Sequence, residues 1–154
     1  MTRFEPKDPE FETRIRESFV RQKVMGLIGA RLTRVEPGRV EIELPFRDDL
    51  TQQHGFFHAG IIGTIADSAG GYAGYTLMAA GSSVMSVEYK INLMTPAEGE
   101  RLVASGQVVK PGRTLTVCDL EVTVFKGGTP TVCARGMQTL ICLEGRGPRG
   151  TAPG

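Results

Sequence analysis

The sequence predicts an α+β protein in which one antiparallel sheet of about six strands wraps around a long buried helix. Three observations support this prediction. The least polar part of the chain, residues 57–80, is long enough for a helix of several turns. A predicted hairpin precedes this segment, and four strand-like segments joined by short turns follow it. Because a single sheet has an apolar face that must be covered, the central helix is the expected cover.

The first expected element is an amphipathic helix over residues 9–23. Its apolar residues recur at helical spacing between charged ones, as in a helix that lies on a protein surface. They are Phe11, Ile15, Phe19 and Val20. We expect Gly26 and Gly29 to end this helical region. Residues 30–46 then predict a β-hairpin, because apolar residues alternate in its second half, after the turn sequence "EPGR".

The central helix is expected over residues 57–80, where Gly81 supplies a stop signal. Four period-two strands should follow in an antiparallel meander, over residues 83–94, 101–110, 115–125 and 131–143. Residues 1–143 thus predict one domain. Residues 144–154 are rich in glycine and have little from which to build a core, so we expect a disordered tail.

The composition excludes several classes of function. The chain has 154 residues and a net charge of +1 with scattered basic residues, so we expect no binding to nucleic acid and none to an anionic membrane. The N-terminal region is charged throughout and lacks the apolar stretch of a signal peptide. Three cysteines without CxxC spacing favour reduced thiols over disulfides or a zinc site. These features predict a cytoplasmic protein.

Asp67 is the one formally charged residue between Leu50 and Val87. Residues 59–80 have the length of a membrane span, but five glycines and a central aspartate favour a buried helix instead. An unpaired buried carboxylate is costly, so Asp67 must be neutralised, well hydrogen-bonded or used in chemistry. Small residues share its side of the helix at three- and four-residue spacing. They are Gly60, Gly63, Thr64, Gly70, Gly71 and Gly74. Tight packing against the sheet and a channel for a substrate chain both explain them.

Three stretches of the chain resemble a known family. "GFFHAGIIGTIADSAGGYA", "MSVEYKINLMTPA" and "VVKPGRTL" are similar to the hotdog-fold acyl-CoA thioesterases. The resemblance is closest to the phenylacetate-pathway type within the 4-hydroxybenzoyl-CoA thioesterase superfamily. The family motif places an amide residue, a glycine and His-Gly-Gly before an acidic residue on the central helix. The matching residues here are Gln52, Gly55, His58, Ala59, Gly60 and Asp67. Ala59 departs from the family's glycine but keeps the backbone N–H.

The resemblance implies the hotdog fold and hydrolysis of an acyl-CoA thioester. Because helix N-termini carry free N–H groups, the N–H of Ala59 could stabilise the oxyanion that forms on the thioester carbonyl. The side-chain amide of Gln52, or of Gln53 with a shifted loop, would add a second donor. Asp67 would act as a general base on water or, alternatively, as a nucleophile.

Five further residues are expected to bind substrate. The resemblance implies that His58 shapes the loop near the thioester and that Gly60 allows the chain to approach the substrate closely. Ser86 matches a family position whose hydroxyl holds the catalytic carboxylate or its water. Lys110 and Arg113 flank a turn that the resemblance places near the CoA phosphates, although such residues also suit a solvated hairpin.

The expected site is shared between subunits. Asp67 lies eight residues after Ala59, about 12 Å along an α-helix, which is too far for both to act on one carbonyl. In the family two sheets join with antiparallel helices, which implies that Asp67 meets the partner subunit's Ala59. We therefore expect a homodimer with a composite active site and, from the resemblance, a homotetramer.

Two alternatives remain open. A non-catalytic acyl-CoA-binding module would use the same cleft without turnover. A hotdog hydratase or dehydratase would use a catalytic histidine, but the His-x-Phe-Pro signature of such enzymes does not occur in this chain. The sequence allows medium-chain and aryl acyl groups alike. We expect no metal, since His54 and His58 alone are weak evidence for zinc, and no cofactor beyond the CoA of the substrate.

Overall fold

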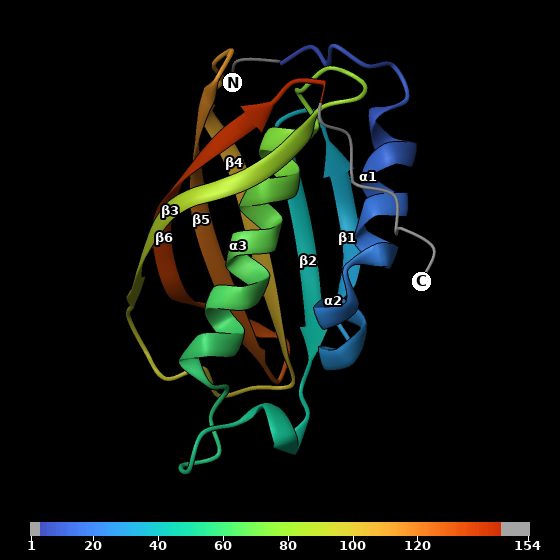
Figure 1. The fold of residues 1–154 in the computed structure, drawn as a ribbon. Helices are drawn as coiled ribbons and strands as arrows, with labels where there is room; N and C mark the ends of the chain where they lie inside the picture. The colour runs from blue at the N-terminus through green and yellow to red at the C-terminus, as the bar shows by residue number, and fades with distance from the viewer. Residues whose placement is uncertain (1–3, 146–154) are drawn as a thin grey trace.

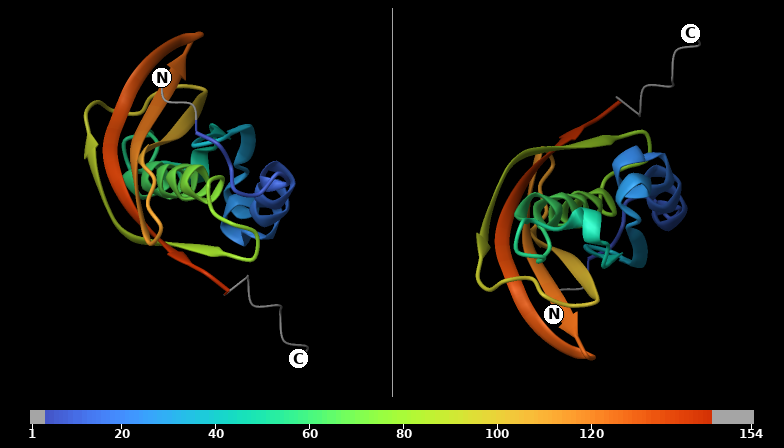
Figure 2. Two further views of the ribbon diagram at one scale, coloured as in Figure 1. Left: turned by 90° about the horizontal axis from the view of Figure 1, so that it is seen from above. Right: turned by 90° about the horizontal axis from the view of Figure 1, so that it is seen from below.

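In the computed structural model, which describes residues 4–145, an antiparallel sheet of six strands curves around one long helix (Figure 1). The helices are α1 (Phe11–Arg21), α2 (Lys23–Ile28) and α3 (Ala59–Tyr75), and η1 (Asp48–Leu50) is a short 3-10 turn. The strands are β1 (Arg31–Glu36), β2 (Arg39–Pro45), β3 (Ser83–Leu93), β4 (Arg101–Lys110), β5 (Leu115–Lys126) and β6 (Thr129–Leu143). Figure 2 shows α3 inside the curve of the sheet, with α1 and α2 at its open side. The predicted α+β fold is confirmed.

The order of the strands differs from the predicted four-strand meander. The sheet runs β1-β2-β4-β5-β6-β3, so only β4, β5 and β6 form a meander. Strand β3 pairs with β6 at the far edge, and the chain then crosses to β4 past the start of α3, where the Ala97 carbonyl accepts a hydrogen bond from the N–H of Phe57 at 3.1 Å. Alternating hydrophobicity identifies a strand but does not specify its partner, which explains the wrong prediction.

Helix α3 ends at Tyr75, five residues before the predicted end at Ala80. The hydroxyl of Thr76 donates to the Ala73 carbonyl at 2.6 Å and accepts a hydrogen bond from the N–H of Gly38 at 2.8 Å. This buried hydroxyl ties the helix end to the β1–β2 turn, and the chain continues in i→i+3 turns. The end of α3 is thus set by a contact distant in sequence.

Arginine from the N-terminal helix also caps α3. Arg14 donates to the carbonyl of Tyr75, the last residue of α3, at 3.4 Å and to that of Met78 at 3.0 Å, and it pairs with Asp8 at 2.8 Å. The amphipathic helix predicted for residues 9–23 is present as α1, with Ile15 buried in the core. However, Gly26 does not end the helical region as expected, because it lies inside the additional helix α2. Gly29, with a φ of 80°, ends α2 in the left-handed conformation.

Glycines allow α3 to lie close against the sheet. A Cβ at Gly106 of β4 would collide with the α3 backbone at Ala69, and a Cβ at Gly74 would collide with Leu140. By contrast, a Cβ at Gly71 would meet no atom within 4 Å. The glycines therefore serve two purposes, close packing on one side of α3 and open space on the other.

Two predictions concern the ends and the environment of the chain. Most of the predicted tail, residues 146–154, lies outside the described residues. Between residues 4 and 145, no helix has the length and apolar character needed to cross a bilayer.

Candidate active site

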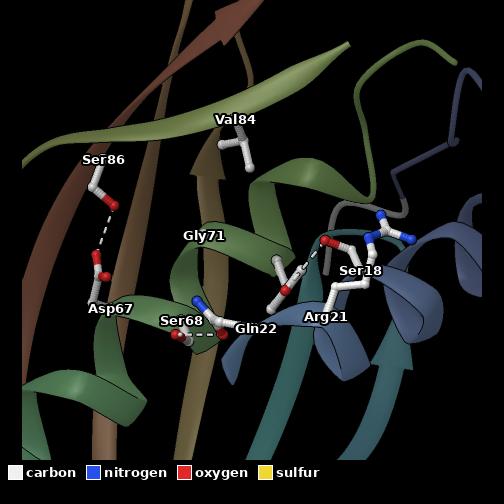
Figure 3. Close-up of a pocket in the computed structure, with 9 residues that line it drawn as sticks. Ser18, Arg21, Gln22, Asp67, Ser68, Gly71, Val84 and Ser86 are labelled. Atoms are coloured by element: carbon white, nitrogen blue, oxygen red, sulfur yellow. Dashed lines mark hydrogen bonds between the residues drawn. The ribbon is translucent and has the colours of Figure 1, made fainter. Parts of the chain in front are cut away.

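Asp67 lies half-buried in the middle of α3 and faces strands β3 and β6. The Ser86 hydroxyl donates to Asp67 Oδ1 at 2.6 Å, and the Gln138 side-chain amide donates to the same oxygen at 2.6 Å (Figure 3 shows the first of these). The Gln138 amide nitrogen also lies 2.9 Å from the Ser86 hydroxyl oxygen. Because both donors bind Oδ1, Oδ2 remains available to a water molecule.

Gln138 was not among the site residues predicted from the sequence. This side chain is only 1% exposed and occupies a core-facing position of β6, two residues before the buried Leu140. A polar residue in the buried phase of a strand needs a hydrogen-bond partner, and this signal could have drawn attention to it. The partner is Asp67 on α3. The Gln138 side-chain oxygen sits in the space left by Gly70, where a Cβ would collide with it.

A β-bulge lies next to Ser86. In the pairing of β3 with β6, Ser86 is opposite Leu140 and Glu88 is opposite Thr139, so Val87 is an extra residue. Bulges bend a strand and redirect its side chains, and they recur beside active sites. Here the bulge accompanies the serine that bonds Asp67. Ser86 and Asp67 line a cleft of about 350 Å³ between α1, α3 and β3 (Figure 3).

The residue proposed as the backbone donor, Ala59, lies at the start of α3. His58 is the N-cap, and its Nδ1 accepts a hydrogen bond from the N–H of Gly60 at 2.8 Å. The N–H of Gly60 is therefore occupied, and His58 shapes this turn as expected. Ala59 is the first residue of α3, so its N–H has no acceptor within the helix.

The loop before α3 orients the side chain of Gln52. Its side-chain oxygen accepts a hydrogen bond from the N–H of His54, which leaves the amide N–H groups free to donate. Gly55, with a φ of 81°, allows the tight turn. Gln52 and Ala59 line one cavity of about 410 Å³, whereas Gln53 is exposed and does not line it. The geometry therefore favours Gln52 over Gln53 as the second donor.

Within one chain the two halves of the predicted site lie apart. Asp67 and Ser86 line the cleft beside α1, whereas Gln52 and Ala59 line the cavity at the start of α3. This separation agrees with the length of the helix between Ala59 and Asp67, about 12 Å.

The structure brings neither Lys110 nor Arg113 into the cleft of Asp67. Arg113 lines a separate cavity of about 380 Å³ with Lys7 and Met78, near the C-terminal end of α3. Lys110 is exposed at the end of β4. Both positions suit a solvated turn as well as a phosphate contact.

Cysteine thiols and groups of possible metal ligands can also be located in the structure. Burial raises the pKa of the Cys118 thiol to about 12 and that of Cys133 to about 11, so neither forms a nucleophilic thiolate near neutral pH. Among residues 4–145, no three His, Cys, Asp or Glu side chains are grouped so that they could hold a metal ion.

A six-stranded antiparallel sheet wrapped around one long helix defines a hotdog protein, and its central helix carries a hydrogen-bonded carboxylate. The chain belongs to the Thioesterase superfamily, whose sequence profile matches residues 54–131. It is similar to the crystal structure of a thioesterase family protein from Silicibacter pomeroyi, with 47% identity and a TM-score of 0.87 over 88% of this chain and 99% of that one.

Curated relatives carry related names. Human acyl-coenzyme A thioesterase 13 is 29% identical over 77% of this chain and 81% of that protein. A putative esterase of Saccharolobus solfataricus is 30% identical over 64% of this chain and 70% of its own length. The PaaI protein of the E. coli phenylacetic acid degradation operon, with 16% identity and a TM-score of 0.78 over 89% of this chain and 96% of that one, shares the fold. Together these findings support a thioester hydrolase.

Proposed function

We propose that the protein is an acyl-CoA thioesterase, which hydrolyses an acyl-CoA to a free carboxylic acid and CoA. The observation that carries this proposal is the environment of Asp67. Its Oδ1 is held by Ser86 and Gln138, and its Oδ2 is left to the cleft. A carboxylate fixed in this way is oriented to accept a proton from water. Membership of the Thioesterase superfamily supports the same reaction.

The proposed reaction proceeds by attack of water on the thioester carbonyl. Asp67 takes a proton from the water as the water oxygen forms a bond to the carbonyl carbon. The N–H of Ala59 and the amide of Gln52 stabilise the resulting oxyanion. The C–S bond then breaks, and the proton passes from Asp67 to the sulfur of CoA. Direct attack by Asp67 is the alternative route, and it would pass through an acyl-enzyme anhydride.

The proposed site is shared between two copies of the chain. One chain places Asp67 and Ala59 in different cavities, so the carbonyl on which Asp67 acts would be held by the partner subunit's Ala59. Strand β3 supports such an assembly. It is an edge strand, and every residue from Met85 to Lys90 is exposed, including Val87 at 57%. An exposed edge strand presents unpaired backbone groups with which another chain can pair. A tetramer remains a prediction.

We further propose that CoA enters only as part of the substrate and that Lys110 and Arg113 contact its phosphates. The cavity beside Arg113 also contains Lys7, which adds a second positive charge. The C-terminal end of α3 lies beside this cavity. With antiparallel helices, this end would approach the start of the partner's helix, where the thioester is held. A cytoplasmic location remains a prediction from the sequence.

Release of free thiol from acyl-CoAs of different lengths tests the proposal, with Asp67→Asn as the diagnostic variant. We expect turnover by the native protein and a loss of about 10²-fold or more in kcat for Asp67→Asn, as for removal of a general base. Asp119→Asn, on the exposed face of β5, is the matched control and should retain native kcat. Equal kcat in native protein and Asp67→Asn would contradict the mechanism. Binding of acyl-CoA without thiol release would favour a non-catalytic module.

A further inference from the structure

The cleft that contains Asp67 extends along α3 to the N-terminal helix. Figure 3 shows Ser18 and Arg21 of α1 at the end of the cleft away from Asp67. Gly71 lies one helical turn beyond Asp67, about 6 Å along α3, and leaves the helix surface clear because it has no Cβ. Val84 of β3 provides an apolar part of the cleft wall between Asp67 and α1. An acyl chain whose thioester lies at Asp67 would therefore run past Gly71 and end at α1.

The far end of this cleft offers hydrogen-bond donors. Ser68 donates its hydroxyl to the Gln22 side-chain oxygen at 3.2 Å, which leaves the amide N–H groups of Gln22 for a ligand. The hydroxyls of Ser18 and Tyr72 lie 3.3 Å apart. Since only one of the two can donate to the other, the second hydroxyl proton is free. These groups suit a ligand that accepts hydrogen bonds.

Arg21 adds a positive charge to the lining of this cleft. Its neighbours on α1 are paired, Arg14 with Asp8 at 2.8 Å and Arg16 with Glu12 at 2.7 Å. No carboxylate between residues 4 and 145 forms an ion pair with Arg21. A basic residue in the last turn of a helix also interacts favourably with the helix dipole, so its position on α1 alone does not imply a ligand. Arg21 also lines the cleft of Asp67, and this second observation points to a ligand.

We propose that Arg21, Gln22 and the Ser18–Tyr72 hydroxyl pair select acyl groups that carry an oxygen substituent at the end opposite the thioester, and a carboxylate above all. This inference rests on the proposed function, because it assumes that the thioester lies at Asp67. A terminal carboxylate would accept charge-assisted hydrogen bonds from the Arg21 guanidinium and further bonds from Gln22. A terminal hydroxyl would use the same donors without the charge, whereas a terminal methyl would leave them without a partner.

Three acyl-CoAs of equal chain length test this selection: adipoyl-CoA, ω-hydroxyhexanoyl-CoA and hexanoyl-CoA. We expect kcat/KM to fall in that order, with adipoyl-CoA favoured over hexanoyl-CoA by about tenfold, the low end for a charge-assisted bond because Arg21 is exposed. The Kd of the Asp67→Asn variant should rise in the same order, from adipoyl-CoA as the tightest ligand to hexanoyl-CoA as the weakest. An equal or better result with hexanoyl-CoA in both measurements would overturn the inference.

The variant Arg21→Met identifies the source of the preference. We expect it to lower the ratio of the adipoyl-CoA value to the hexanoyl-CoA value by about tenfold, in kcat/KM and in affinity. Lys23→Met removes an exposed charge from the next helix, outside the cleft, and should keep the native ratio. An unchanged ratio in Arg21→Met would also overturn the inference.

The two readouts separate the inference from the proposed function. A Kd preference for adipoyl-CoA without thiol release from any substrate would support the selection and contradict the hydrolase. Thiol release without any preference would support the hydrolase and contradict the selection.

Discussion

Asp67 is held by two neighbours that come from different strands. Ser86 reaches it from β3 and Gln138 from β6, and both bond the same carboxylate oxygen. Gln138 is buried and reaches the cleft only through Asp67 and Ser86, which makes it a positioning residue. Groups that fix a reactive side chain in this way contribute to the reaction without touching the substrate.

We expect Gln138→Leu to lower kcat by about tenfold while KM changes by less than about twofold, because the substitution frees Asp67 to rotate without removing a substrate contact. Leucine suits this core position, so the fold should persist, and a thermal unfolding curve checks this. The readouts are kcat and KM, since loss of positioning lowers kcat whereas loss of a substrate contact raises KM. Gln107→Leu, on the other face of the sheet, is the control. A rise in KM with kcat unchanged would show that Gln138 does not position Asp67.

The candidate site residues differ in how well the sequence alone predicts them. Asp67 was conspicuous because it is the one charge in a long apolar segment. Gln52 could be preferred over Gln53 only after the loop showed which amide lines the cavity with Ala59. Gln138 was missed because a glutamine within an alternating strand looks like a solvent-facing residue. Its phase with Leu140 is visible in the sequence, but its partner Asp67 is set by the packing of α3 on the sheet, which a sequence pattern does not contain.

Helix α3 has one packed side and one open side, and two adjacent glycines separate them. A Cβ at Gly70 would collide with the Gln138 side-chain oxygen and lie 2.5 Å from Leu120. A Cβ at Gly71 would have no neighbour within 4 Å. The sequence placed both glycines on one side of the helix, and either packing or a channel could explain them. The structure assigns packing to Gly70 and open space to Gly71.

This contrast predicts opposite effects of the same substitution at adjacent positions. Gly70→Ala should lower the free energy of unfolding by about 1–3 kcal/mol through overpacking. Gly71→Ala should raise it by about 0.5–1 kcal/mol, because alanine favours the helix and meets no obstacle. Urea unfolding of both variants beside the native protein measures these changes. Equal stability of the two variants would contradict the described packing of α3.

The bounds of some helices and strands are set by local sequence signals, and those of others by contacts distant in the chain. The period-two segments from Arg101 onward became strands close to their predicted bounds, because alternation is a local signal. The end of α3 was misplaced because the Thr76 hydroxyl bonds a turn nearly forty residues away in the chain, at Gly38. The position of β3 beside β6 was missed for the same reason, since pairing partners are set by the fold rather than by the strand itself.

For the protein as an assembly, the separation of Asp67 from Ala59 has a direct test. Ala59→Pro removes the proposed oxyanion N–H, and proline is well tolerated at the first position of a helix. His58 already has the extended conformation that precedes proline. Both Ala59→Pro and Asp67→Asn should be inactive alone. Random mixing of the two, by unfolding and refolding together, should restore about a quarter of native activity, because half of the dimers then contain one intact site of two.

The mixing experiment can also contradict a site shared between two chains. A site contained within one chain would give no recovery, because every chain would lack either the base or the donor. Refolded native protein supplies the reference activity, and each variant refolded alone supplies the background. When the two folded variants are combined without unfolding, activity should recover only as fast as subunits exchange between dimers.

The contact between Gly70 and Gln138 also bears on how such a chain can change over time. The two residues lie on different elements, and the Gln138 side chain fills the space that Gly70 leaves because it has no Cβ. A larger residue at position 70 is therefore accommodated best together with a shorter one at position 138, and that second change releases Asp67. We expect relatives with a side chain at position 70 to lack the glutamine at position 138, and therefore to hold the carboxylate in another way.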